Sequence, residues 1–128
     1  MQTKPTLLVV LLLAFTLFGC TNERGETVST SANPTAEEIL TADPTANVFQ
    51  WKEIIYETDI DWVEELELQE DKIIGEIEVK VSKANEFKNG AANQLPIGAK
   101  IYSVKGHHDI LVVKYAEQTK RYLALVEG

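Results

Sequence analysis

The residues able to build a folded core are concentrated in one part of the chain, from Val48 to Gly128. This part holds both Trp residues, all four Tyr residues and most of the Val and Ile residues. A stretch of this size supports one small hydrophobic core, and it is too short for a multi-domain enzyme or a (β/α)₈ barrel. The sequence therefore predicts one small domain over 48–128.

Short apolar runs predict strands within this domain. Two runs rich in β-branched residues, Asp109–Tyr115 and Arg121–Val126, are separated by the polar residues Glu117–Lys120, a spacing typical of a β-hairpin. Ile77, Val79 and Val81 alternate with charged residues, which predicts a half-buried strand. Further strand candidates are Lys100–Val104 and Phe49–Tyr56, and turn signals are Lys88–Gly90 and Pro96–Gly98.

Within this domain, only Asp59–Leu68 favours a helix. Asp61 with Glu64 three residues later resembles a capping box, although Leu66–Leu68 alternates as a strand would. We therefore expect one short helix or turn here, leading into a strand. The predicted fold class is mostly β: a small barrel or curled antiparallel sheet of about five to seven strands, with at most one short helix.

The N-terminus carries an apolar run, Leu7–Phe18, interrupted only by Thr16. Lys4 is the only charged side chain before Cys20. A helix needs about 20 residues to span the bilayer core, so this run is too short for that role. A short basic start before a run of this length predicts a secretory signal peptide.

The run ends in Leu17-Phe18-Gly19-Cys20, which resembles the lipobox of bacterial lipoproteins. This resemblance implies cleavage between Gly19 and Cys20 and a diacylglyceryl group on the Cys20 thiol, with palmitate among the attached lipids. It also implies a lipid-anchored protein on the extracytoplasmic face of the cell membrane. Two acyl chains suffice for stable attachment, at roughly 0.8 kcal/mol per buried CH₂. As the only cysteine, Cys20 also excludes an internal disulfide and a Cys-based zinc site.

Thr21–Asn47 is rich in Thr, Ser, Pro and Asn and has few large apolar residues. Such a composition predicts a disordered tether that holds the domain about 30 Å from the membrane. Within it, Thr35–Leu40 suits a capped helix start, either as a transient turn or as a partner-binding helix. The expected organisation is a signal peptide over 1–19, a lipidated cysteine and flexible spacer over 20–47, and the β domain over 48–128.

Two further segments, Leu95–Tyr102 and Arg121–Gly128, resemble small, uncharacterised lipoproteins of Gram-positive, Bacillus-like bacteria. This resemblance implies a location and a compact domain. It implies no activity and no site residue.

The chain is acidic, with a formal net charge of -8, which argues against binding nucleic acid. Eight acids and no base lie between Glu57 and Asp71, whereas the rest of the domain has ten bases and seven acids. An EF-hand is excluded because Val63 stands at the third ligand position and Glu64 replaces the required Gly. The segment is either a solvated face or a surface for a cationic partner. The candidate contact residues are Glu57, Asp59, Asp61, Glu64, Glu65 and Glu67.

His107, His108 and Asp109 are side chains of the kinds that bind metals. Neighbouring residues on a strand point to opposite faces, so both His side chains serve one site only if they lie in a turn, which Gly106 permits. No third or fourth ligand is identifiable. The alternatives are a small metal site and an exposed hairpin loop.

No catalytic grouping is recognisable. Ser82 and Ser103, the only serines of the domain, lie in no nucleophile elbow, and no Gly-rich phosphate loop occurs. We therefore expect no enzyme and no cofactor. Aromatic residues are expected to fill the core, although an exposed subset would form an interface hot spot. They are Trp51, Tyr56, Trp62, Tyr102, Tyr115 and Tyr122.

Taken together, these features predict a membrane-anchored extracytoplasmic lipoprotein whose β domain acts as a binding module. Its partner would be a cationic protein or a cell-envelope component. The alternatives are a small metal or ligand carrier that uses the His pair, and an inhibitor of a secreted cationic hydrolase.

Overall fold

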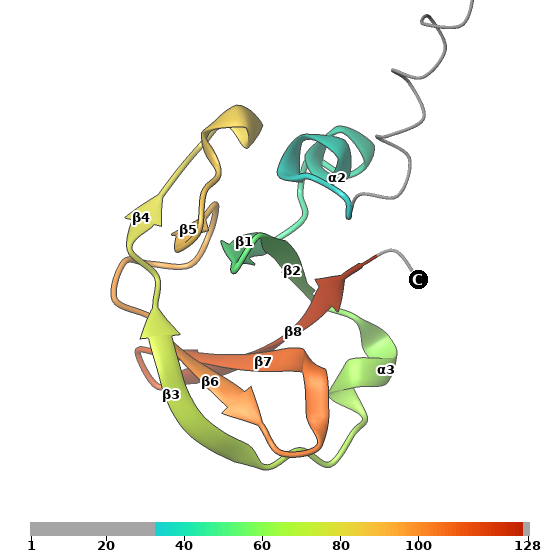
Figure 1. The fold of residues 1–128 in the computed structure, drawn as a ribbon, viewed down its shortest axis with the longest axis vertical. Coiled ribbons are helices and arrows are strands. Elements are labelled where there is room, and N and C mark those ends of the chain that lie inside the picture. The colour runs from blue at the N-terminus through green and yellow to red at the C-terminus, as the bar shows by residue number, and fades with distance from the viewer. Residues whose placement is uncertain (1–32, 127–128) are drawn as a thin grey trace, which may run out of the picture. The chain divides into compact units, whose positions relative to one another are not determined.

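The computed structural model describes residues 33–126, and the predicted signal peptide and lipobox lie outside this range. The described part is mostly β, as predicted, and its strands form one curled sheet (Figure 1). The strands are β1 (Val48–Trp51), β2 (Ile54–Thr58), β3 (Glu70–Glu76), β4 (Val79–Lys80), β5 (Ala91–Ala92), β6 (Lys100–Val104), β7 (His107–Tyr115) and β8 (Gln118–Leu125). The helices are α2 (Ala36–Ala42), the single turn α3 (Asp61–Glu64) and the 3₁₀ turn η2 (Ala84–Glu86).

The sheet has eight strands in the order β3-β6-β7-β8-β2-β1-β5-β4, more than the five to seven expected. All neighbours are antiparallel except β4 and β5, which pair in parallel. The predicted hairpin of β7 with β8 forms, and the strand candidate Phe49–Tyr56 forms a second hairpin, β1 with β2. Their two-residue turns, Lys52-Glu53 and Ala116-Glu117, have positive φ throughout, the backbone that matches the right-handed twist of paired strands.

The first and last strands of the sheet are consecutive in the chain. Only Ile77 and Glu78 separate β3 from β4, and Figure 1 shows the chain passing from one directly into the other. The N–H of Ile77 donates to the carbonyl of Ala99 at 2.9 Å, and that of Glu78 donates to the carbonyl of Gly90 at 2.8 Å. One segment therefore serves as both edges, which forces the sheet to curl around its inner face.

The inner face holds the main core. Phe49 stacks on Tyr56 with ring centroids 5.2 Å apart and meets Tyr122 edge-on at 4.9 Å. Ile77, the residue that joins the two edges, is fully buried in the same cluster. The curl thus closes around three packed aromatic rings. Such ring pairs stabilise the fold beyond the contribution of the apolar area that they bury.

The outer face is also partly apolar. Along β7, Leu111 and Val113 point inward, whereas Ile110 and Val112 belong to a separate outer cluster. Burial on both faces explains why this strand reads as an unbroken apolar run rather than an alternating one. The outer face therefore needs a cover, and the two helical segments provide it.

Helix α2 covers one outer patch. Ala36 is buried against Val48 and Ile55, with Ile39 and Leu40 packed alongside. The helix begins with the capping box that the sequence favours at Thr35: its hydroxyl accepts from the N–H of Glu38, whose carboxylate accepts from the N–H of Thr35. The compact unit therefore begins at Asn33 rather than at Val48, because residues expected in the spacer pack on the sheet.

The strand pair β3–β6 carries a close contact across the curl. A Cβ atom on Gly75 of β3 would overlap Cη2 of Trp51 and would lie 2.6 Å from its Cζ2. Trp51 comes from β1, far from β3 in strand order, so the contact joins two distant parts of the sheet. Glycine is required here to let the indole approach the backbone.

Gly75→Ala is therefore expected to lower the free energy of unfolding by about 1–3 kcal/mol, the usual effect of overpacking. Adding Trp51→Phe, which removes the overlapping part of the indole, should recover part of the loss. Urea denaturation measures both variants, with Lys72→Ala on the same strand as the control. Additive effects of the two substitutions would contradict the proposed contact.

Candidate interaction surface

The acidic segment begins at the end of β2 and continues through α3. Its apolar side chains, Ile60, Val63, Leu66 and Leu68, pack on the outer cluster formed by Val104, Ile110 and Val112. Val63 is completely buried. Because the apolar positions face the sheet, the intervening acidic residues face solvent. Asp59, Asp61, Glu64, Glu65 and Glu67 are all exposed, and Glu57 is half-buried.

Arg121 fixes this segment to the sheet. Its Nη1 donates to the carbonyl oxygens of Val63 at 2.8 Å, Glu64 at 3.2 Å and Leu66 at 2.7 Å. The backbone carbonyl of Arg121 in turn accepts from the hydroxyl of Thr58 at 2.6 Å. The guanidinium thus satisfies carbonyls at the end of α3 and just after it. This cation binds backbone oxygens rather than carboxylates.

The expected capping box of α3 is also absent. Ile60, not Asp61, is the N-cap residue, and no side chain caps the turn. Packing of Val63 and the hydrogen bonds from Arg121 therefore stabilise α3 in place of a cap. Asp59 precedes it with φ 67°, a conformation that Asp tolerates better than most residues.

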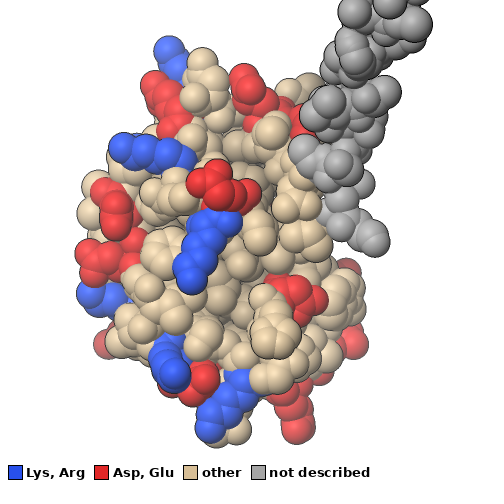
Figure 2. Space-filling view, in the orientation of Figure 1, with Lys and Arg blue, Asp and Glu red and all other residues tan. Residues whose placement is uncertain are grey.

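The six candidate contact residues of this segment lack basic partners within the described residues, whereas Glu70 near its end is paired. The ion pairs found there join Lys100 to Glu76 at 2.7 Å and Lys114 to Glu70 at 2.6 Å, both along the β3–β6–β7 edge. None involves the six candidate contact residues. Acidic side chains also gather at the right-hand edge of Figure 2, where Figure 1 places α3. The six carboxylates thus form an uncompensated negative surface.

Glu57 differs from the other five acids in its surroundings. It lies on β2 opposite Val48 on one side and Leu123 on the other. Burial raises the pKa of its carboxyl, and the nearby charges of Asp43 and Asp59 raise it further. Asp43 ends α2, so charges from the end of α2 and from the loop after β2 both act on Glu57.

The structure does not bring the two His side chains together. His107 and His108 are the first residues of β7, after the turn at Lys105-Gly106, and they point to opposite faces. His107 is half-buried, whereas His108 and Asp109 are exposed. Between residues 33 and 126, no three His, Cys, Asp or Glu side chains converge in a way that would hold a metal ion.

Of the six aromatic residues singled out from the sequence, only Trp62 is exposed. Half of its surface, 52%, is accessible, whereas Tyr56 and Tyr122 are buried and the others are half-buried. Spacing alone does not distinguish Trp62 from a core residue. Trp62 is exposed because the side chains of Ile60 and Val63, on either side of it in the sequence, face the sheet.

Ser103, one of the two serines of the domain, has a structural role. The Ser103 hydroxyl accepts from the N–H of Lys72 at 3.2 Å and so bridges an irregularity in the β3–β6 pairing. A cavity of about 300 Å³ lies between the start of α2, the β1–β2 turn and η2, with Thr35, Glu53 and Phe87 in its lining. None of the described helices has the length and apolar character needed to cross a bilayer.

No protein-family model, curated protein or solved structure matches the chain with significance.

The raised pKa of Glu57 predicts a pH-dependent change in stability. The folded state holds this proton to a higher pH than the unfolded chain does, so stability falls as the pH rises from below the ordinary carboxyl value through the raised pKa. Glu57→Gln removes that loss. The variant is expected to be more stable at pH 7, by about 0.5 kcal/mol or less because solvent screens the group.

Urea unfolding at pH 7 and at about pH 3.5, where the carboxyl is protonated in both states, measures this effect. The gain should disappear at the lower pH. Glu65→Gln is the control, because it removes the same charge from an exposed position. A gain that persists at low pH would mean that packing, rather than charge, is responsible.

Proposed function

We propose that this protein is a lipid-anchored, extracytoplasmic binding module that recognises a cationic partner through its acidic surface. The anchor is Cys20, by resemblance to the bacterial lipobox, and the surface consists of the six carboxylates between Glu57 and Glu67. One observation carries the proposal: these carboxylates project from a segment held rigidly by Arg121, and none of them is paired with a base in the described part.

Rigidity matters because a preformed surface binds at a lower entropic cost than a surface that must first be ordered. An unpaired surface also loses no internal ion pair when a partner arrives. Like charges on one face steer basic partners and speed their association, with a strong dependence on ionic strength.

The position of the folded unit limits where binding takes place. The residues between the proposed anchor and the folded unit are 21–32, because α2 belongs to that unit. A fully extended chain rises at most about 3.6 Å per residue, so the first residue of the unit lies within about 45 Å of the lipid-bearing cysteine. This stretch is shorter than the expected spacer that ended at Asn47. The proposed partner is therefore one that comes close to the membrane surface.

Neutralising the acids is expected to abolish partner capture. The full chain carrying Glu64→Gln, Glu65→Gln and Glu67→Gln should recover far less cationic protein from envelope extract than the natural protein does. Capture by the natural protein should fall as salt is raised, since surface charges are screened beyond about 8–10 Å near physiological salt. A control variant with Gln at Glu78, Glu86 and Glu117 removes the same charge elsewhere and should capture normally. Salt-insensitive capture, or capture that survives the first set of substitutions, would refute the acidic surface.

Cys20→Ala tests the anchor. The variant is expected either to leave the membrane fraction or to keep an uncut signal, because no thiol remains to receive lipid. Fractionation and intact mass give the answer, with Thr21→Ala as the control. A Cys20→Ala protein that is processed and fractionates as the natural protein does would show that the anchor is wrong.

A further inference from the structure

Trp62, an exposed aromatic residue in the acidic segment, indicates the chemistry of the proposed partner in more detail than the charges alone do. Trp62 lies on α3 with 52% of its surface accessible, although Trp is a residue that folded proteins usually bury in large part. Its exposure does not come from a loose loop. The next residue, Val63, is completely buried, and Arg121 holds the carbonyls of that turn. A rigid, exposed indole is the type of side chain that most often dominates binding energy at an interface.

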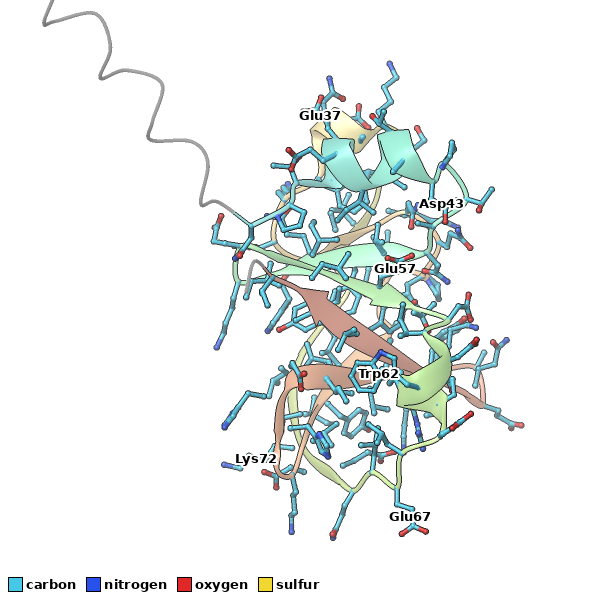
Figure 3. All side chains as sticks on the ribbon, turned by 90° about the vertical axis from the view of Figure 1, so that its right-hand side faces the viewer. Glu37, Asp43, Glu57, Trp62, Glu67 and Lys72 are labelled. Atoms are coloured by element: carbon cyan, nitrogen blue, oxygen red, sulfur yellow. The ribbon has the colours of Figure 1, made fainter. Side chains whose placement is uncertain are left out.

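The charges around the indole select what can cover it. Figure 3 shows Trp62 between Glu57 and Glu67 on the face turned to the viewer. Asp61 and Glu64 belong to the same helical turn, and Glu65 follows it directly. A purely apolar partner would remove water from these carboxylates without pairing them, which costs free energy. A basic partner would pair them and place a cation over the indole, the aromatic ring that binds cations best.

Two other occupants are disfavoured by the same charges. An anionic lipid surface would be repelled by the carboxylates that flank the indole. A second copy of this chain, related by a two-fold axis through the patch, would place acids against acids. Charge complementarity therefore favours a basic segment of another protein.

We propose that Trp62 is the anchor point of the surface, where the indole face receives an Arg or Lys side chain of a partner protein while the flanking carboxylates pair with neighbouring basic residues. This inference rests on the proposed function and adds the contact residue and the side-chain chemistry of the partner. Arg121 does not compete for the indole, because its guanidinium is bound to the carbonyls behind α3.

The test uses the full chain in detergent and two ten-residue peptides, one alternating Arg with Ala and one alternating the uncharged isostere citrulline with Ala. Calorimetry at low salt is expected to show binding of the Arg peptide only. Trp62→Leu should weaken that binding about five- to tenfold, and Trp62→Phe should weaken it less because an aromatic face remains. Ile97→Ala is the matched control, since Ile97 is also exposed, at 66%, but lies outside the acidic segment.

Intrinsic fluorescence supplies a second readout. The Arg peptide should change the emission of the natural protein and leave that of Trp62→Leu unchanged, because the remaining Trp51 packs against the core cluster. Unchanged affinity in Trp62→Leu, or equal binding of the citrulline peptide, would overturn this inference. If Gln at Glu64, Glu65 and Glu67 abolishes binding while Trp62→Leu does not, the acidic surface stands and the role of Trp62 fails. If Trp62→Leu abolishes binding while those substitutions have no effect, the aromatic contact stands and the acidic surface fails.

Discussion

The double role of the segment that contains β3 and β4 is the constraint on which the rest of the structure depends. Because this segment pairs with β6 at one end and with β5 at the other, the sheet cannot lie flat. The curl brings Trp51 of β1 onto the backbone of Gly75 and encloses Phe49, Tyr56 and Tyr122. It also leaves little unprotected edge. Two irregularities in the β3 pairing and the charged residues of that strand further protect it from pairing with other chains.

A curled sheet with apolar residues on both faces needs segments that cover its outer face, and the outward side of one of these segments is the candidate interaction surface. Ile110 and Val112 point away from the inner core, so some segment must remove them from water. The residues from Ile60 to Leu68 do so with apolar side chains spaced to face the sheet. The intervening positions are then necessarily exposed, and in this chain they are acidic or, at Trp62, aromatic. The negative surface is thus the outward side of a structural element, and it acquires its rigidity from the packing of its inward side.

Some sequence patterns of this chain determine the secondary structure locally, whereas others depend on the strand register. The bounds of β6 match the prediction, and the β7–β8 hairpin was predictable because dense β-branched runs separated by a short polar gap have few other interpretations. The ends of that hairpin were not predicted correctly: β7 begins at His107 and β8 at Gln118, earlier than Asp109 and Arg121, because polar residues next to the turns also pair. Helix α2 was assigned to the spacer because only three of its residues, Ala36, Ile39 and Leu40, reach the sheet. Their burial depends on Val48 and Ile55 facing outward, which is a property of the strand register and not of the local composition.

The acidic surface itself was visible in the charge run, but its organisation was not. Arg121 lies more than fifty residues from the carbonyls that it binds. Every residue has a backbone carbonyl, so the sequence does not indicate which ones accept these hydrogen bonds. The distinction between Trp62 and the buried aromatics likewise depends on which side of a single helical turn meets the sheet.

In the proposed function, the length of the tether and the range of the surface charges have separate roles in recognition. Salt screens exposed charges beyond about 8–10 Å near physiological conditions, a length much shorter than the reach of about 45 Å that the chain between Cys20 and Asn33 allows. The acidic surface therefore cannot attract a partner from across that distance. Under the proposed function, the anchor would determine the layer of the envelope in which encounters occur, and the carboxylates would act only once a basic segment is within about a nanometre. At that range the indole of Trp62 would add a short-range contact that salt weakens less than the surrounding ion pairs. Selectivity among basic partners would then depend on the fit to Trp62, because nearly any basic segment satisfies the carboxylates.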